Sequence, residues 1–372
     1  MSDERRLLSE TTMRFLEKYG SVRWVRSHSD EVSAFDAEGW RQGASLGWAA
    51  MLVPEDLGGG SVSGEGLLDA VAIAEQLGRA LHPAPFLSTN VVASALVRSG
   101  SRQARAEFVP RLTAGELVGA WCYTERPGSY DPARLELRVR TVGDGFELHG
   151  TKYYVQDGHC AGVLLVTGRD DSGGLTQVVL PRDAAGVTVE SMSCMDLTRR
   201  VAQVRFDRTI LPRSAAIGEP GAASGDVERQ LTLALVLQCA DSVGAMEPLH
   251  EMTIEYAKER FAFGRAIGSF QAVKHRCVEM YRGLVGSRAV TAAAAEAVQQ
   301  ARPDAADLAA IAKAYVGEAA SRSAEHAHQI HGGISYTWEH DTHLYSRHAK
   351  FNEAMFGSPG WQRERLGRRL GV

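Results

Sequence analysis

One connection between two helix-rich runs carries residue types that suit a flat, anionic ligand. Residues 260–271 read RFAFGRAIGSFQ. Arg260 offers a planar fork of N–H donors that matches phosphate oxygens. Gln271 opens the next helical run, where free backbone N–H groups favour anions, and Phe263 adds a flat apolar face. A helix–helix turn with a stacked phenylalanine has the same residues, so both interpretations stay open at this point.

A second stretch, QIHGGISYTWEHD (329–341), could bring a backbone close to a ligand. It places Gln329 at the end of a helical run, followed by Gly332 and Gly333. Glycine allows close approach of the backbone, and exposed N–H groups can hold a pyrophosphate. A Gly pair after a helix is also an ordinary stop signal, so this stretch alone is weak evidence for a ligand.

A third set of residues could contact a planar heterocycle. In AWCYTERPGSYD (120–131) a strand leads into a loop, and Thr124 can donate a hydrogen bond to a ring carbonyl or nitrogen. In GTKYYVQDGH (150–159), alternation along a strand places Tyr154 and Gln156 on one face. A cross-strand aromatic pair in a barrel wall is an equally good local explanation.

Three regimes of apolar periodicity predict the elements that position these residues. Residues 1 to about 117 repeat apolar side chains at three- and four-residue steps, as helices do. From about 118 to 215, alternating runs rich in Val, Leu and Tyr predict a small antiparallel β-barrel or sandwich. The predicted N-terminal helices cover 3–18, 36–48, 64–81, 86–99 and 103–114. The predicted strands cover 146–156, 162–169, 176–182, 187–192 and 202–207.

Long helices return from about residue 226 and predict an up-and-down bundle. The first covers 227–260, with Pro248 as a kink or break, and the others cover 271–301 and 304–332. We therefore expect an α+β protein of three domains: a helical domain (1–117), a β domain (118–218) and a C-terminal helical bundle (219–372). No GxGxxG follows a strand and no GxxxxGK[ST] occurs, which argues against Rossmann and P-loop folds.

Composition excludes several classes of function. The net charge of −4 gives no basic field for nucleic acid. The five cysteines are widely spaced without CxxC, which fits free thiols in a reducing cytosol. The charged N-terminus does not resemble a signal peptide, and no apolar run approaches the roughly 18 residues of a spanning helix. We expect a cytoplasmic protein without a metal site, since His326, His328 and His331 match a helix face better than a ligand set.

In order along the chain, these stretches resemble the acyl-CoA dehydrogenase family. The motifs that carry the resemblance are VPEDLGGG (53–60), the TE of WCYTERPG, the GTK of LHGTKYYVQDGHCA, RFAFGRAIGSFQ with AVKH after it, and QIHGGISYTWEHD. The resemblance implies FAD bound between subunits, α,β-dehydrogenation of an acyl-CoA thioester, and an electron-transfer flavoprotein as acceptor. It also implies an obligate oligomer, because no subunit completes a cofactor site alone.

The resemblance assigns the candidate residues to two different flavins. Those assigned to the adenine and pyrophosphate end of a neighbouring subunit's FAD are Arg260, Phe263, Gln271, Gln329, Gly332 and Gly333. Those assigned to the isoalloxazine ring of this chain's own FAD are Trp121, Tyr123, Thr124, Tyr154 and Gln156.

The catalytic base is where the sequence departs from the family. Many members have a glutamate near the C-terminus where this chain has Phe356, and a second known base position falls on Ala234. A subset resembling actinobacterial steroid side-chain dehydrogenases has a glutamate before a VG pair on the first bundle helix, and Asp241 occupies that place in CADSVGAME. Its apolar surroundings predict a raised pKa, as a useful base needs. The alternatives are Glu247, Glu353 or a residue of a partner.

The flavin-ring strands depart as well, which keeps three functions open. The usual TEP-G-x-GSD loop reads TERPGSYD, and Tyr154 and Gln156 replace the usual Trp and Ser/Thr. The first function is an FAD-dependent dehydrogenase for a bulky acyl-CoA such as a steroid side chain, as a homo-oligomer or a heterotetramer. The second is a non-catalytic or half-site subunit that completes the FAD site of a homologous chain. The third is a flavin oxidase or monooxygenase on the same fold.

Overall fold

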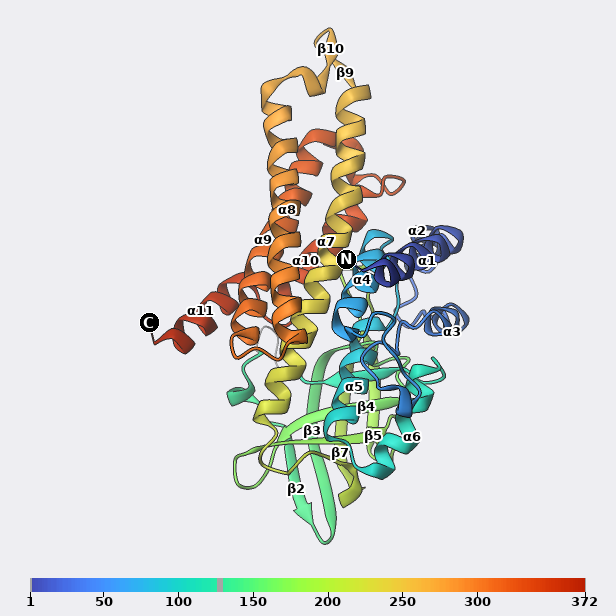
Figure 1. The fold of residues 1–372 in the computed structure, drawn as a ribbon, viewed down its shortest axis with the longest axis vertical. Coiled ribbons are helices and arrows are strands. Elements are labelled where there is room, and N and C mark those ends of the chain that lie inside the picture. Colours follow the sequence, from blue (N-terminus) through green and yellow to red (C-terminus); the bar gives the residue numbers. More distant parts are fainter. Residues whose placement is uncertain (1, 126–129, 372) are drawn as a thin grey trace.

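The computed structural model describes residues 2–125 and 130–371, and it places helices on both sides of one long central helix above a sheet (Figure 1). The N-terminal helices are α1 (Asp3–Tyr19), α2 (Ser21–Ser27), α3 (Ala37–Ser45), α4 (Gly66–Arg79), α5 (Phe86–Ser99) and α6 (Arg102–Thr113). The predicted helices at 3–18 and 86–99 are confirmed to within one residue, while the one at 36–48 ends early at Ser45. No helix within these described ranges is long and apolar enough to cross a membrane.

The sheet follows α6 and contains eight strands among the described residues. They are β1 (Gly119–Cys122), β2 (Arg138–Val142), β3 (Gly145–Gln156), β4 (Val163–Arg169), β5 (Leu175–Pro181), β6 (Val187–Met192), β7 (Val201–Pro212) and β8 (Ala216–Ile217). The spatial order is β6-β7-β3-β2-β4-β5-β8, with β1 beside β4. The sheet is not purely antiparallel, because β1 and β2 both pair with β4 in parallel. Strand β4 is buried along almost its whole length, which explains its continuous apolar run.

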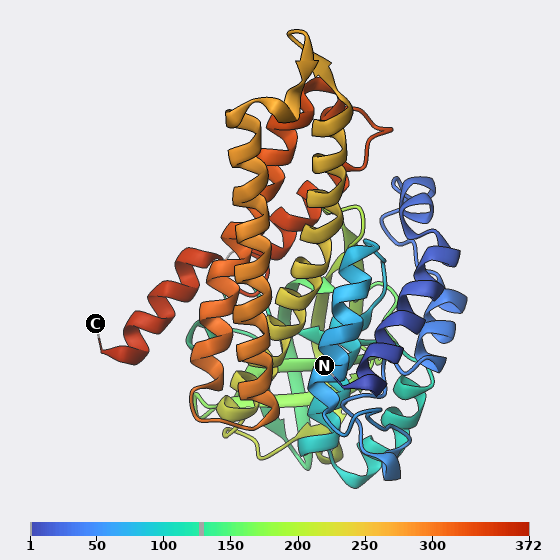
Figure 2. The same ribbon diagram turned by 45° about the horizontal axis from the view of Figure 1, so that its top comes forward.

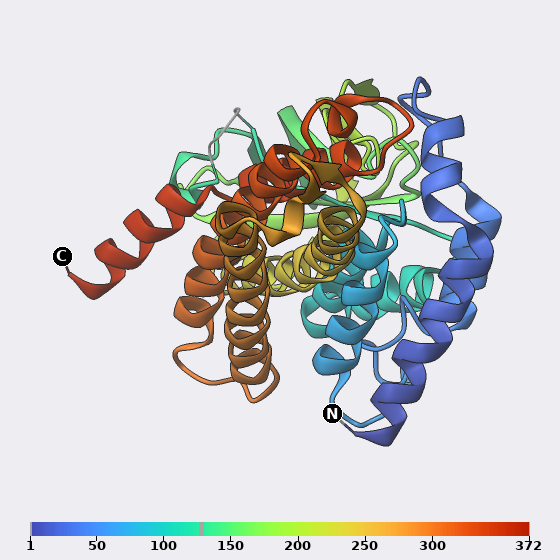
Figure 3. The ribbon, with the colours of Figure 1, turned by 90° about the horizontal axis from the view of Figure 1, so that it is seen from above.

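The C-terminal part is built around α7 (Ser224–Glu259), which has 36 residues and is therefore about 54 Å long. Pro248 lies inside α7 without ending it. The hairpin β9 (Phe261–Ala262) and β10 (Arg265–Ala266) caps its upper end (Figure 1). The chain continues through α8 (Gln271–Gln299), α9 (Ala305–His331), α10 (Thr342–Ala354) and α11 (Pro359–Leu370). Figures 2 and 3 show α8 and α9 on one side of α7 and the N-terminal helices on the other.

Helices α4 and α7 approach each other backbone to backbone at two glycines. A Cβ atom at Gly78 would lie 1.8 Å from the carbonyl oxygen of Asp241, and one at Gly244 would lie 1.9 Å from that of Glu75. Real side-chain carbons do not approach backbone oxygens so closely. The two glycines therefore set the spacing that holds the middle of α7 against the N-terminal helices.

We expect Gly244→Ala to lower the free energy of unfolding by about 1–3 kcal/mol, because the new methyl group must push α4 and α7 apart. Gly283→Ala is the matched control on α8, where the nearest atom would lie at an ordinary 3.5 Å. Alanine favours helix there, so the control should be neutral or stabilising by up to about 1 kcal/mol. Urea unfolding measures both variants. Equal changes would contradict the close approach.

Candidate active site

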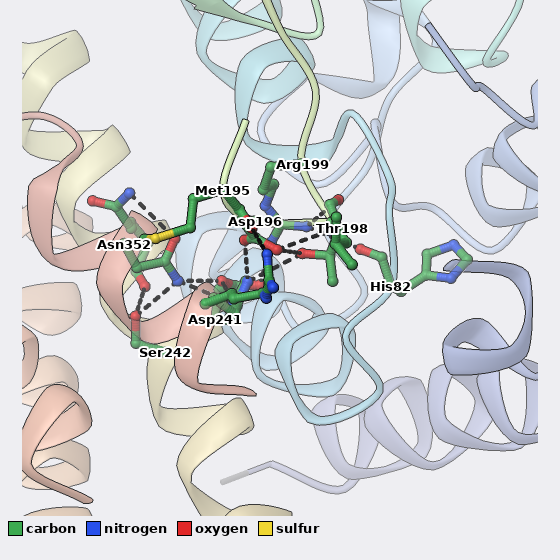
Figure 4. A network of polar contacts seen from close by, with 12 residues as sticks. His82, Met195, Asp196, Thr198, Arg199, Asp241, Ser242 and Asn352 are labelled. Carbon is green, nitrogen blue, oxygen red and sulfur yellow. Dashed lines mark hydrogen bonds and ion pairs between the residues drawn. The ribbon is translucent and has the colours of Figure 1, made fainter. Parts of the chain in front are cut away.

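A cluster of buried charges joins three separate parts of the chain (Figure 4). Asp241 comes from α7, Asp196 and Arg199 from the connection between β6 and β7, and His348 and Asn352 from α10. Arg199 Nη2 lies 2.7 Å from Asp241 Oδ1. The two ring nitrogens of His348 contact Asp241 Oδ2 at 2.6 Å and Asp196 Oδ2 at 2.8 Å. Asn352 Nδ2 donates to Asp241 Oδ2 at 2.7 Å, so Asp241 is paired on both oxygens.

Local sequence explains how these side chains reach one point. His348 and Asn352 are four residues apart on α10 and therefore share a face. Asp196 turns the β6–β7 connection by accepting hydrogen bonds from the backbone N–H and the hydroxyl of Thr198, both at 2.8 Å. This turn directs Arg199 towards α7 (Figure 4).

The electrostatics of the cluster overturn one expectation about Asp241. Burial alone would raise the pKa of Asp241, but the guanidinium of Arg199 and the imidazolium of His348 hold it well below its usual range. The predicted raised pKa is therefore wrong, because the sequence pattern showed the apolar neighbours and not the two cations. A carboxylate in this state accepts a proton weakly at neutral pH.

His348 is protonated in the folded chain because both of its nitrogens face carboxylates. Burial would lower the pKa of His348, but Asp241 and Asp196 outweigh that effect and raise it to about 9. Two anions and two cations therefore neutralise one another in a buried site.

A cavity of about 20 Å³ lies beside Asp241 and is lined by Gln156, Gln238, Arg199 and Asn352 together with apolar side chains. This volume is on the order of one water molecule. The side-chain oxygens of Gln156 and Gln238 are buried and accept no hydrogen bond from the described residues. The structure thus brings Asp241 and Gln156 to one cavity, but this packing leaves no room for an acyl chain.

The other residues assigned to this chain's own flavin ring are packed into its interior or lie at a strand irregularity. Trp121, Tyr123 and Thr124 are buried, and Trp121 Nε1 donates to Thr167 Oγ1 at 3.3 Å. Tyr154 has φ +52° and lies where the pairing of β3 with β7 shifts by one residue. This bulge interrupts the regular alternation that was expected to place Tyr154 and Gln156 on one face.

The residues assigned to a neighbour's flavin gather at the free end of the bundle. Phe263, in the hairpin, is 94% exposed, and Arg260 and Gln271 beside it are also exposed. Gly332 has φ +65°, and no atom lies near the place where a Cβ would be. Gln329 and Gly333 complete this surface, which we call the bundle tip. Gln271 is the first residue of α8, and no side chain caps that helix, so its backbone N–H groups can meet an anion.

The two sets of residues lie at different levels of α7, and the flavin-ring set extends from the start of the helix to the cavity beside Asp241. Thr167 Oγ1 accepts hydrogen bonds from both Trp121 Nε1 and Gln177 Nε2. Gln177 Nε2 also donates to Gln230 Oε1 at 2.7 Å, and Gln230 lies near the start of α7. Arg260 follows the last residue of the same helix. Thirty residues of helix separate Gln230 from Arg260, a distance of about 45 Å. Each set is brought together within itself, but one chain does not bring the two sets to each other.

Sequence reasoning missed the charged partners of Asp241. Arg199 and Asp196 belong to a charged segment, DLTRR, between two apolar strands, and that segment was a usable signal. His348 and Asn352, at four-residue spacing on α10, were the second signal. A buried ion pair between Lys152 Nζ and Glu125 Oε1, at 2.7 Å, also went unpredicted, although it lies in the GTK and TE motifs.

We expect the free energy of unfolding to fall as pH rises, by an amount that depends on His348. Its pKa is raised from 6.5 to about 9 on folding, so its contribution is complete below pH 6.5 and is lost as pH rises through 9. His348→Gln should remove most of this dependence, on the order of 2 kcal/mol between pH 6 and 9. The control is His343→Gln, on the same helix, where the histidine has a lowered pKa. Urea unfolding at several pH values measures the slopes, and an unchanged slope in His348→Gln would contradict the assignment.

Comparison with known proteins places this chain in one family. Residues 2–116 match the model of the acyl-CoA dehydrogenase N-terminal domain, and residues 226–371 match that of the C-terminal domain. The acyl-CoA dehydrogenase IpdE2 of Mycobacterium tuberculosis is 32% identical over 96% of this chain and 94% of its own.

Two solved structures show the same fold. One chain of the ChsE4–ChsE5 complex of Mycobacterium tuberculosis has a TM-score of 0.88 at 27% identity and covers 100% of this chain and 98% of its own. A chain of the Tcur3481–Tcur3483 steroid ACAD has a TM-score of 0.90 at 25% identity and covers 99% and 98%. This chain belongs to the acyl-CoA dehydrogenase family, oxidoreductases that act on CH–CH bonds.

Proposed function

We propose that this chain is a subunit of a heteromeric FAD-dependent acyl-CoA dehydrogenase and completes the FAD site of a homologous partner chain. The observation that carries the proposal is the separation of the two half-sites. The bundle tip is exposed, whereas the ring residues Trp121 and Tyr123 are buried in the interior, away from the end of α7 that carries Arg260. A site that needs both halves must take them from two chains.

At the bundle tip, each side chain has a role that its chemistry supports. Arg260 offers donors to phosphate oxygens, and the first turn of α8, which starts at Gln271, offers backbone N–H groups. Gly332 and Gly333 let the backbone approach a pyrophosphate, because a side chain at either position would point into the open space. Phe263 provides a flat face for an adenine ring, and Gln329, at the end of α9, provides an exposed hydrogen-bonding amide. FAD supplies the redox chemistry when bound.

The catalytic base is better sought in the partner. Phe356 and Ala234 carry no proton acceptor, and both lie in the core. Asp241 is ionised but held by Arg199 and His348, so it would have to give up two charge partners to take a substrate proton. A partner with a free carboxylate would supply the base, while the bundle tip of this chain would contact the adenine and pyrophosphate end of the partner's FAD.

We extend the proposal to the substrate, the electron acceptor and the assembly. The α,β-desaturation would act on an acyl-CoA, with a bulky acyl group such as a steroid side chain, in line with the steroid ACAD of the same fold. The assembly would be a heterotetramer, since ChsE4–ChsE5 is described as a complex of two named chains. An electron-transfer flavoprotein would be the acceptor.

A second candidate function is a self-sufficient dehydrogenase in which Asp241 is the base and Trp121, Tyr123, Thr124, Tyr154 and Gln156 face the chain's own flavin. One observation favours it, because Asp241 and Gln156 line the same cavity. The third function, a flavin oxidase or monooxygenase, stays a prediction that depends on oxygen reaching the flavin.

We expect the chain purified alone to carry little flavin and to show no bleaching of a flavin band when acyl-CoAs are added without oxygen. Coexpression with a homologous chain should give a yellow complex whose flavin band bleaches with one acyl-CoA. Anaerobic visible spectra of both preparations measure this. A yellow chain that bleaches alone, and no longer does so as Asp241→Asn, would favour the second candidate instead.

We expect Arg260→Ala to lower the flavin content of that complex at least about tenfold at limiting FAD, equivalent to roughly 1.4 kcal/mol of binding free energy, because a charge-assisted phosphate contact is lost. Lys258→Ala is the matched control. It removes a cation two residues away, where Lys258 Nζ pairs with Glu255 at 2.6 Å. Flavin absorbance per protein measures both. Equal flavin content in the two variants would refute the role of the bundle tip.

A further inference from the structure

Five aromatic rings pack together around Trp121 and Tyr123, two of the residues that the resemblance assigns to this chain's own flavin ring. Trp121 stacks on Tyr123 with ring centres 4.6 Å apart, and Phe356 stacks on Trp121 at 5.9 Å. Tyr130 lies 6.2 Å from Phe356 and 6.5 Å from Trp361. Phe356 is 6% exposed. Trp121 is therefore already stacked with two flat side chains of the same molecule.

Phe356 is held in place by contacts that are built for this position. Its φ of +57° is unfavourable for a residue with a large side chain and persists only when the surroundings enforce it. Gln362, fully buried on α11, donates from Nε2 to the carbonyl oxygen of Phe356 at 2.8 Å. Tyr130 Oη contacts the sulfur of the preceding Met355 at 3.6 Å.

A buried cation fixes the turn of helix that leads into this segment. Lys313 on α9 is 2% exposed, and its Nζ contacts the carbonyl oxygens of Asn352 and Glu353 at the end of α10. These carbonyls have no later helical N–H to accept from, and the ammonium satisfies them. The position of Phe356 is thus set from α9, α10 and α11 together.

Trp121 and Tyr123, which we call the ring wall, also direct their polar atoms into the protein. The indole N–H of Trp121 donates to Thr167, and the hydroxyl of Tyr123 donates to the carbonyl oxygen of Tyr130 at 2.6 Å. Neither group is left facing outward to receive a ring carbonyl. The described residues of the protein thus satisfy both polar groups of the ring wall without a ligand, in contrast to the bundle tip, where Phe263 is exposed.

We propose that Phe356 is an aromatic plug that keeps a flavin ring out of this chain's own half-site, so that each copy serves only its partner's FAD. This inference rests on the proposed function, because it names the side chain that makes this chain's own ring site silent. With Phe356 in this position, flavin binds in the assembly against the partner's ring residues and not against Trp121 and Tyr123 of this chain.

The test uses the purified chain alone with lumiflavin, which is an isoalloxazine ring without ribityl, pyrophosphate or adenine groups. Phe356→Ala should remove the ring stacked on Trp121, so that lumiflavin can stack there instead and its fluorescence is quenched saturably. Binding should be at least about tenfold tighter than to the unaltered chain. Phe108→Ala is the matched control, because Phe108 is equally buried, at 5% exposure, on α6. It should bind no better than the unaltered chain.

Two outcomes overturn the plug. One is a folded Phe356→Ala that binds lumiflavin no better than Phe108→Ala, and the other is an unaltered chain that already binds it as tightly. If Phe356→Ala does not fold, Phe356→Leu keeps most of the apolar volume without the stacked ring, and it should show a smaller gain in the same direction. Lumiflavin lacks the adenine and pyrophosphate groups that the bundle tip is proposed to hold, and the comparison with Phe108→Ala cancels any stacking on Phe263. This result is therefore independent of Arg260→Ala, and the two proposals can fail separately.

Discussion

Four buried charges that must neutralise one another constrain the centre of this molecule. Asp241, Asp196, Arg199 and His348 come from α7, from the β6–β7 connection and from α10, and each loses its solvation on folding. An unpaired member would cost several kcal/mol, so the three segments are tied together at fixed spacing. The glycine contacts between α4 and α7 act at the same level of the helix, because the Cβ of a residue at 78 would strike the carbonyl of Asp241 itself. Packing of the N-terminal helices and pairing of the charges therefore depend on each other.

The length of α7 limits which residues one chain can bring together. The helix begins beside the sheet, where Gln230 pairs with Gln177, and ends at the hairpin that carries Phe263. A continuous helix of 36 residues cannot bend the bundle tip back to the ring wall, and Pro248 does not break it. One chain therefore does not bring the bundle tip to Trp121 and Tyr123, which is the physical reason for proposing a partner.

Periodicity predicted the helices and most strands because it reports burial, which is a local property of sequence. The helix Phe86–Ser99 and the strand Val187–Met192 were predicted with the observed bounds. The environment of Asp241 could not be predicted in this way, because its partners Arg199 and His348 are 42 and 107 residues away along the chain. The bulge at Tyr154 was not predicted for a related reason. Alternation of side chains describes a regular strand and does not indicate an extra residue. A helix start is a local feature of sequence, and Gln271 was predicted to open a helix and does so.

The TE and GTK motifs contain residues that stabilise the fold, so their presence alone does not establish that a flavin binds there. Lys152, with no exposed surface, donates to the carbonyl oxygen of Tyr123 at 3.0 Å and pairs with Glu125. Glu125 in turn accepts from the backbone N–H of Leu137 at 2.8 Å. These contacts close the loop between β1 and β2 whether or not a flavin lies against it. A chain can therefore match the family at both motifs for reasons of folding alone, and the side chain that decides whether the ring site is open is Phe356, outside either motif.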